Sequence, residues 1–393
     1  MDTDRLKSTW HAVTLHGDDV ALYFYAHLFV THPELRDMFP LAMDAQRDRL
    51  VGALGRVVSN VDQLGEVVPY VEQLGRDHRR FAVIAEHYDA VGASLLWTLK
   101  HFLGEEWTAE VARDWADAYG VVAATMVAAA EESEDKQPAW WDAEIIEVAR
   151  VSREIAVVRV LPDNPLPYRS GQSVAVTIPH APRVWRYFTP ANAPREDGGI
   201  EFHVGLVPGG LVSVPFVKKA RRGDIVRIGA PVGNALAIDP LADSDLLMVA
   251  GGTGIAPFLA LLDEIEQGWQ LGKTERRVHL VHGARYPWNL YAGSRLDQLA
   301  SNPEFTHTQV VSDDPTYPGT RGLVGDVAST VTMPGSYDAL VCGSPLMVSH
   351  TTTALAGGQR PPESIALEEF SITSEPPAEV TVAAPAHSIG GSS

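Results

Sequence analysis

The chain is poor in cysteine and in basic residues, and it has no long apolar run. A single cysteine, Cys342, excludes an internal disulfide framework. The 50 acidic residues outnumber the 31 basic ones, and the formal net charge of −19 disfavours nucleic acid and anionic membranes as partners. Residues 1–10 lack an apolar signal core, and no stretch is apolar enough to span a bilayer. These absences predict a cytoplasmic protein with neither nucleic acid nor membrane as a partner.

The chain does have enough length and apolar content for several folded domains. Its 393 residues are 45% hydrophobic, which allows about two or three domains, each with its own core. Apolar residues first recur at helical spacing, then alternate in short runs, and finally form strands that alternate with helical patterns. We therefore expect an all-α domain over residues 1–137, an antiparallel β-domain over residues 138–241, which is a β-barrel or a sandwich with the barrel preferred, an α/β domain with a parallel sheet over residues 242–372 and a disordered tail over residues 373–393.

Three polar side chains fall on apolar faces of the predicted helices. In VPYVEQLGRDHRRF, His78 continues the apolar face that includes Leu74. Such a histidine is either a core residue bonded to a carbonyl or an axial ligand of haem iron. Tyr25 in ALYFYAHLF and Gln46 in DAQRDRL also face inward, where each needs a hydrogen-bond partner. Together they indicate a pocket with a metal ligand on one side and hydrogen-bond donors on the other.

This helical segment resembles the globin domain of flavohaemoglobins. The resemblance lies in LYFYAHLFVTHPELRDMFP, DAQRDRL, EQLGRDHRRF and HYDAVGASLLWTL, and it covers residues 1–132. It implies a b-type haem with His78 as the proximal iron ligand. It also implies that Tyr25 and Gln46 on the distal side stabilise negative charge on bound dioxygen. The residues implied to pack against the haem are Phe39 and Leu50.

The same resemblance places Tyr88 and Glu132 behind the proximal histidine. A carboxylate in contact with the imidazole would make it more basic and direct electron density to iron. Glu132 is alternatively a solvated charge in the run EESEDK, and its neighbour Glu131 is then the candidate for the inward position.

Residues 144–375 resemble the ferredoxin–NADP reductase family, which implies FAD and NAD(P)H as further cofactors. The family's flavin signature, Arg-x-Tyr-Ser, corresponds to WRYFTPANAP. The alternative is a strand with buried aromatic residues that binds no flavin, because it would have the same sequence pattern. The turn PGGLVS resembles a Gly-Gly-x-Val-Ser turn whose N–H groups approach phosphates. Ser173 follows a matching Gly-Gln pair but stands where an aromatic residue is common. The implied FAD-binding residues are Arg186, Tyr187, Phe188, Thr189, Gly209, Gly210, Val212 and Ser213.

The segment DLLMVAGGTGIAPFLALLDEI is typical of a strand, a glycine-rich turn and a helix that together bind a pyrophosphate. YDALVCGSPLM resembles the family's Cys-Gly-Pro segment near the nicotinamide, and IALEEFSI resembles its terminal strand beside the flavin. Plain core positions are the alternative for the cysteine and the phenylalanine. The implied residues are Gly252, Thr253, Gly254, Ile255, Ala256, Pro257, Cys342, Gly343, Glu368 and Phe370.

The combined resemblance implies a monomeric nitric oxide dioxygenase, in which NAD(P)H reduces haem through FAD and nitric oxide and dioxygen become nitrate. One alternative is a haem–flavin oxidoreductase for another substrate, such as an alkyl hydroperoxide or a biosynthetic intermediate. Another is a haem-based gas sensor or carrier with a vestigial reductase. Arg276, Arg277 and Arg285 are either ligands of a 2′-phosphate or surface charges, so the choice between NADH and NADPH stays open.

Overall fold

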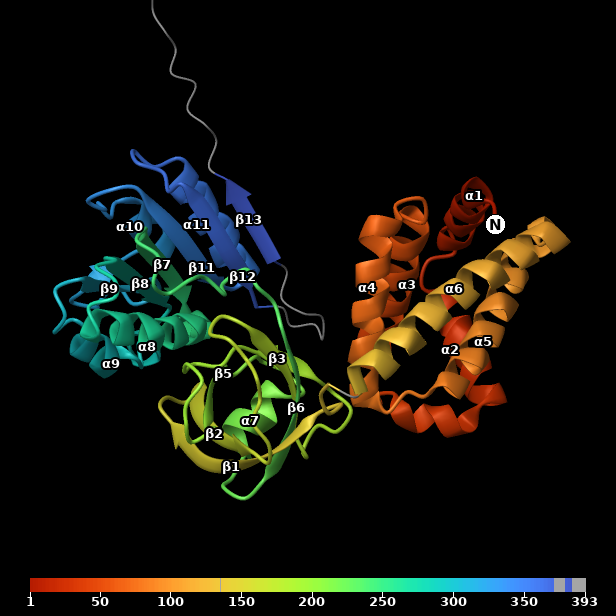
Figure 1. The fold of residues 1–393 in the computed structure, drawn as a ribbon, viewed down its shortest axis with the longest axis horizontal. Coiled ribbons are helices and arrows are strands. Elements are labelled where there is room, and N and C mark those ends of the chain that lie inside the picture. Colours follow the sequence, from red (N-terminus) through yellow and green to blue (C-terminus); the bar gives the residue numbers. More distant parts are fainter. Residues whose placement is uncertain (135, 371–378, 384–393) are drawn as a thin grey trace, which may run out of the picture. The chain divides into compact units, whose positions relative to one another are not determined.

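The polypeptide folds into two compact units, Met1–Trp140 and Trp141–Ser393 (Figure 1). The structure, a computed structural model, describes residues 1–134, 136–370 and 379–383. Within these ranges no helix is long and apolar enough to cross a membrane. The fold class predicted from the sequence is confirmed: helices come first, then an antiparallel barrel, then a parallel α/β sheet.

Helices build the first unit around a core that includes Leu6, Phe24, Leu28, Leu99 and Trp115. Short 3-10 turns at Pro33–Met38, Arg79–Phe81 and Gly104–Glu106 join some of the helices. The helices are α1 (Thr3–Thr14), α2 (Asp19–Thr31), α3 (Asp44–Ser59), α4 (Leu64–His78), α5 (Ala85–Leu103) and α6 (Ala109–Glu134).

Helices α4 and α6 lie side by side (Figure 1) at a very close approach. Gly75 on α4 permits this approach, because a Cβ at that position would stand 2.2 Å from the main-chain oxygen of Met126 on α6. The glycine precedes His78 by about one helical turn. The packing of α4 on α6 therefore fixes the position of the His78 backbone, from which the imidazole extends.

The barrel of the second unit is a six-stranded antiparallel sheet in the order β4-β3-β6-β1-β2-β5, with the short helix α7 (Ser213–Lys218). Val158, Val174, Phe202, Phe216 and Ile228 are among its buried core residues. The strands are β1 (Trp141–Arg150), β2 (Ile155–Pro162), β3 (Ser173–Thr177), β4 (Arg186–Phe188), β5 (Ile200–Gly205) and β6 (Ile225–Val232).

A seven-stranded sheet in the order β10-β9-β8-β7-β11-β12-β13 follows, and all its pairings except β12 with β13 are parallel. Core residues of α8 and α9 cover one face, and those of α10 and α11 cover the other. The elements are β7 (Asp245–Gly251), α8 (Ala256–Gln270), β8 (Val278–Ala284), α9 (Gly293–Leu299), β9 (Phe305–Val311), β10 (Thr320–Arg321), α10 (Val324–Ser329), β11 (Tyr337–Gly343), α11 (Pro345–Ala356), β12 (Ser364–Glu369) and β13 (Glu379–Ala383).

Part of the expected disordered tail is a strand. Residues 379–383 form β13 and pair antiparallel with β12, so the expectation of irregular structure does not hold for these five residues. The segment EVTVA contains three consecutive β-branched residues, which favour a strand, and β12 otherwise presents an open sheet edge that a further strand can join. The remainder of that tail, apart from this strand, lies outside the described residues.

Candidate functional site

Tyr25 and Gln46 lie together in the first unit, as the sequence predicts. Tyr25 on α2 is buried between Phe29 and Phe39, whose ring centroids lie 5.7 and 5.6 Å from its own. Its hydroxyl donates to the main-chain oxygen of Gln46 on α3 over a long 3.4 Å. Burial raises the pKa of the Tyr25 hydroxyl to about 12, so the group remains a hydrogen-bond donor across the physiological pH range. Leu50, one turn after Gln46, packs half-buried against the same core.

His78 is the last residue of α4, and its ring is held by the main chain. Its Nδ1 lies 2.6 Å from the main-chain oxygen of Leu74, which can only accept, so Nδ1 carries the proton. The lone pair of the neutral ring therefore resides on Nε2, which has no hydrogen bond to any residue that the structure describes. Burial lowers the pKa of His78 and thus favours the neutral ring. A neutral imidazole with an available Nε2 is a suitable haem-iron ligand.

The expected carboxylate behind His78 is not found there, which corrects the assignment of Glu132. The Glu132 side chain is 69% exposed and pairs with Lys136 at 2.6 Å. Glu131, the alternative, is exposed as well, and the buried residue of this last turn of α6 is Ser133. The helical phase explains the result, because Met126, Ala129 and Ser133 face the core and the two glutamates between them do not.

A different side chain joins the end of α4 to the end of α6. Arg79 donates through Nη1 to the hydroxyl of Ser133 at 2.9 Å and through Nη2 to the main-chain oxygen of Gln137 at 2.9 Å. Tyr88 on α5 is half-buried, and its main-chain oxygen accepts from the Tyr119 hydroxyl at 2.6 Å. No hydrogen bond joins Tyr88 to His78 in the described ranges, so the structure does not bring these two side chains into direct polar contact.

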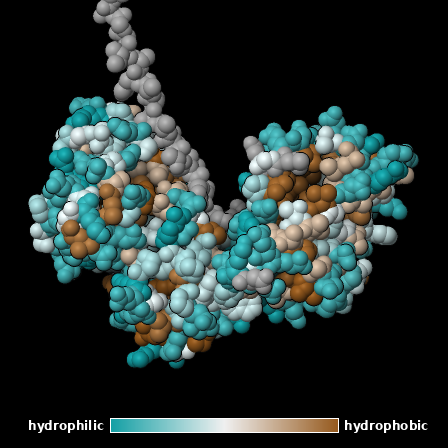
Figure 2. All heavy atoms as spheres, in the orientation of Figure 1, coloured by the Kyte–Doolittle hydropathy of each residue, from teal (hydrophilic) through white to brown (hydrophobic). Residues whose placement is uncertain are grey.

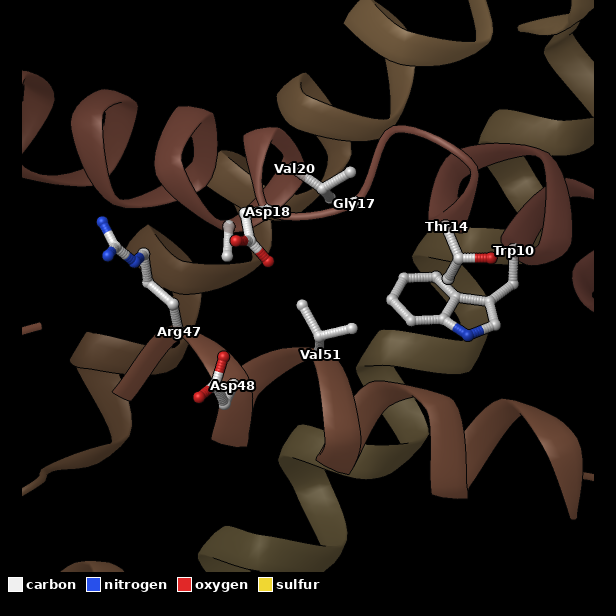
Figure 3. Close-up of a pocket in the computed structure, with 9 residues that line it drawn as sticks. Trp10, Thr14, Gly17, Asp18, Val20, Arg47, Asp48 and Val51 are labelled. Atoms are coloured by element: carbon white, nitrogen blue, oxygen red, sulfur yellow. The ribbon is translucent and has the colours of Figure 1, made fainter. Parts of the chain in front are cut away.

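A neighbouring face of α3 lines a separate cavity of about 250 Å³ together with α1, the loop that follows α1, and α2. Arg47, Asp48 and Val51 of α3 line it together with Trp10 of α1 and Val20 of α2 (Figure 3). None of the residues predicted for the haem site lines this cavity. The two faces of α3 are therefore distinct, with Gln46 and Leu50 on one and Arg47 and Val51 on the other.

In the barrel, the flavin signature forms the short strand β4, which pairs with β3. Phe188 is half-buried, and its ring packs edge-on against Phe216 at 5.7 Å and near Phe202 at 6.1 Å. Arg186 and Tyr187 are also half-buried, and Arg186 donates through Nη1 to the main-chain oxygen of Trp185 at 2.8 Å. One side of the Phe188 ring therefore belongs to the barrel core, as the alternative interpretation expects.

Thr189, Ser173 and Glu368 form a buried cluster where the barrel meets the parallel sheet. The Thr189 hydroxyl donates to Glu368 Oε1 at 2.8 Å, and it lies 2.8 Å from the Ser173 hydroxyl. Residues distant in the sequence, two of them implied to bind cofactor, are thus brought together. Cys342 lies opposite Glu368 in the register of β11 and β12, and burial raises the pKa of its thiol. Phe370 directly follows β12 and is half-buried, and its N–H donates to the Gly343 oxygen at 2.9 Å.

The turn PGGLVS precedes α7, as expected. Gly209 has a φ of +74°, a conformation that favours glycine. At Gly210 a Cβ would stand 2.4 Å from the Ser213 hydroxyl, which itself accepts from the Val207 N–H at 3.1 Å. Val212 is buried in the barrel core. The backbone of this turn is therefore compact and fixed in place.

The glycine-rich turn lies where the order of the parallel strands reverses. The chain moves from β7 to β8 and β9 on one side, and returns to β11 on the other side of β7. Ligands of α/β sheets bind outside the carboxyl ends of the strands at such a point. Gly254 packs on β11 so closely that a Cβ would stand 2.3 Å from the Cys342 oxygen. Pro257 lies in the first turn of α8, and Gly252, Thr253, Ile255 and Ala256 complete the passage from β7 to that helix.

The sequence did not predict a series of buried polar side chains that contact one another behind this turn. His282 on β8 is fully buried, and its Nε2 donates to the Gly252 oxygen at 2.9 Å. Its ring lies edge-on to Tyr291 at 6.1 Å, and the Tyr291 hydroxyl is 2.9 Å from His203 Nδ1 on the barrel strand β5. Glu201 completes the chain at 2.9 Å from His203 Nε2. His282, the second histidine in VHLVHGA, falls in a mostly apolar strand, and no periodicity distinguishes it from a core position.

Arg276 and Arg277 do not lie near the turn. Both immediately precede β8, and Arg276 is buried with its Nη1 donating to the Asp239 oxygen at 2.9 Å. Arg277 pairs with Asp245 at the start of β7 at 3.3 Å. Both arginines therefore lie at the amino ends of the parallel strands, whereas the glycine-rich turn lies at the carboxyl ends. Arg285 follows the carboxyl end of β8 and is exposed, so it alone of the three remains a candidate phosphate ligand.

The donor set and the walls of these sites fit the implied cofactors. His78 offers a lone pair on Nε2, and apolar atoms are exposed among polar ones on the surface of the helical unit (Figure 2). Half-buried apolar side chains packed against the core of this unit include Phe29, Phe39, Leu50 and Leu54. In the second unit, two glycine turns offer main-chain N–H groups to phosphates.

Comparison with known families divides the chain in the same order as the fold. Residues 22–126 match the globin family, residues 142–236 match the oxidoreductase FAD-binding domain, and residues 248–353 match the oxidoreductase NAD-binding domain. The cofactors haem, FAD and NAD(P)H predicted from the sequence are confirmed by these matches.

The chain is similar over nearly its full length to proteins that combine these domains. It is 27% identical to a flavohemoprotein of Bacillus subtilis over 93% of this chain and 95% of that protein. A flavohemoglobin from Malassezia yamatoensis, solved with bound FAD and heme, has the same fold with a TM-score of 0.71 at 18% identity, covering 94% of this chain and 98% of that one. The reductase component of a Pseudomonas phenol 2-monooxygenase is 33% identical over 53% of this chain and 59% of that protein.

Proposed function

Because this chain belongs to the flavohaemoglobin family, a globin joined to FAD- and NAD-binding oxidoreductase domains, we propose that its oxidoreductase activity is that of a nitric oxide dioxygenase. Such an enzyme combines nitric oxide with dioxygen to give nitrate, using electrons from NAD(P)H. When bound, the haem supplies an iron centre for a diatomic gas, and the flavin accepts a hydride and releases its electrons singly.

The observation that carries the proposal is the buried phenol of Tyr25 beside Gln46. The hydroxyl keeps its proton, since burial raises its pKa to about 12, and its present bond to the Gln46 oxygen is long at 3.4 Å. A donor with a weak present partner can turn toward a ligand that gains negative charge. Retaining an oxygen ligand until nitric oxide arrives needs a donor of this kind.

The partner of His78 favours gas binding over peroxide cleavage. A main-chain oxygen, not a carboxylate, accepts from Nδ1 at 2.6 Å. A neutral acceptor increases the basicity of the imidazole less than a carboxylate does, so less electron density reaches the iron. The alkyl hydroperoxide alternative therefore ranks below the dioxygenase.

The reductase residues support repeated turnover rather than sensing alone. Thr189 and Ser173 both contact Glu368, which fixes the Thr189 hydroxyl at the end of the flavin signature. His282 holds the Gly252 carbonyl and so sets the shape of the turn that would receive the pyrophosphate. A vestigial reductase would have no reason to retain these buried polar contacts.

The test compares three reactions of the holoprotein supplied with NADH. We expect fast loss of nitric oxide with dioxygen present, much slower loss without it, and slow reduction of cumene hydroperoxide. Faster turnover of the peroxide than of nitric oxide with dioxygen would contradict the proposal.

A further inference from the structure

Arg49 contacts the side chain of Gln46 from the next turn of α3. Its Nη1 donates to Gln46 Oε1 at 3.0 Å, and both residues are half-buried. Arginine has hydrogen-bond donors and no acceptor, so only the amide oxygen can face it. The contact therefore fixes the amide orientation, with the N–H groups of Gln46 directed away from Arg49.

The charge of Arg49 also reaches Tyr25. Burial is the main influence on the Tyr25 hydroxyl and raises its pKa, while the Gln46 contact and the Arg49 charge act in the opposite direction. Arg49 thus acts on both predicted distal donors, on Gln46 through a hydrogen bond and on Tyr25 through its field.

We propose that Arg49 is a positioning residue of the distal haem site, which holds the amide of Gln46 so that its N–H groups serve the oxygen ligand. The proposal rests on the proposed function, since it requires Gln46 to face the haem. An amide that rotated freely would present its oxygen to the ligand part of the time and repel the negative charge that the ligand gains.

The neighbouring Arg47 provides a matched control. It lies on the same helix, pairs with Asp44 and lines the separate cavity beside Asp48 and Val51 (Figure 3). Arg47→Met and Arg49→Met remove the same charge from α3 and leave the same unbranched stem. A general effect of charge or helix stability would be similar in both variants, whereas an effect through Gln46 belongs to Arg49 alone.

The experiment measures the infrared C–O stretch of the carbon monoxide complex and the oxygen dissociation rate of the holoprotein. We expect Arg49→Met to raise the C–O frequency and to release oxygen about tenfold faster, as loss of a hydrogen bond to a charged ligand predicts. Arg49→Lys keeps a charged donor, so both its C–O frequency and its oxygen dissociation rate should stay close to those of the unaltered protein. Arg47→Met should match the unaltered protein in both measurements.

A double variant separates the failure of this inference from failure of the proposed site. In a Gln46→Leu background, Arg49→Met should have a much smaller effect on both measurements, because only the influence of the Arg49 charge on Tyr25 remains. An undiminished effect in that background, or no effect of Arg49→Met alone, would overturn the inference while leaving the site in place. If Gln46→Leu by itself changes neither measurement, the distal assignment is wrong and the role of Arg49 falls with it.

Discussion

Tyr25 is the residue whose position and chemistry bear most directly on the function. Tyr25→Phe keeps the ring and its contacts with Phe29 and Phe39, and it removes only the hydroxyl. We expect oxygen to dissociate roughly tenfold to a hundredfold faster, from the loss of a hydrogen bond to a charged ligand of about 1.5–3 kcal/mol. The control is Tyr23→Phe on the same helix, whose hydroxyl accepts from Trp97 at 3.1 Å. Equal dissociation rates in the two variants, measured by stopped flow, would remove Tyr25 from the distal site.

His282 gives the second unit a predicted sensitivity to acid. Burial lowers its pKa from an ordinary 6.5 to about 4, and the charge of His203 acts in the same direction. Because the folded pKa is depressed, the unfolded chain takes up the proton first. The free energy of unfolding therefore falls as pH drops from 6.5 toward 4, and His282 adds no pH dependence above that window.

The shift corresponds to about 2 kcal/mol lost between pH 7 and pH 5. His282→Gln keeps an N–H donor for Gly252 and cannot be protonated, so its unfolding free energy should lose that part of the acid dependence. Denaturant titrations of the full chain at pH 7 and pH 5 measure it. An unaltered difference between the two pH values would contradict the assignment.

Sequence reasoning at this scale succeeded where periodicity places a polar residue among apolar ones. It placed Tyr25 and Gln46 on inward faces of their helices, and the structure brings the two residues together. It placed His78 within a helix that continues to Phe81, whereas α4 ends at His78. It failed for Glu132, because the phase of α6 over its last turn was not fixed by the charged run EESEDK. It missed His282 because a buried histidine in an apolar strand resembles a core residue until its partner, the Gly252 oxygen, is seen.

Among the elements, the packing of α4 on α6 positions the proposed iron ligand. Gly75→Ala would put a Cβ 2.2 Å from the Met126 oxygen, so the two helices must separate. We expect about 1–3 kcal/mol lower stability of the first unit and weaker haem retention. Gly120→Ala on α6 is the control, because a Cβ there meets nothing within 4 Å. It should be neutral or stabilising by up to about 1 kcal/mol. Equal haem retention in both variants, measured by transfer to apomyoglobin, would contradict this role of α4.

The sequence predicts the order and type of the helices and strands more completely than it predicts which strands pair with each other. Helical spacing, short alternating runs and the strand–turn–helix segment predict the three parts of the fold in the observed order. The exception is β13, a short segment beyond a Pro-rich stretch, whose pairing depends on the open edge of β12. Such an edge is a property of the folded sheet, and the local sequence does not contain it.

For the whole molecule, two compact units predict separable loss of cofactors. His78→Ala removes the Nε2 lone pair from the first unit, whereas the second unit, Trp141–Ser393, has its own cores. We expect the variant to lose haem, to retain FAD and to reduce ferricyanide with NADH at the unaltered rate. Haem content by pyridine haemochrome and FAD by fluorescence after release test this. Loss of both cofactors together would contradict independent folding of the two units.

We propose that the whole molecule uses electrons from NAD(P)H, delivered through FAD to the haem, to convert nitric oxide and dioxygen to nitrate. The most direct measurement counts nitrate formed for each NADH oxidised when oxygenated holoprotein receives nitric oxide in small portions. Each hydride carries two electrons and each nitrate requires one, so two nitrate ions should form per NADH. Oxidation of NADH that continues without nitrate, or at the same rate when nitric oxide is withheld, would contradict the account.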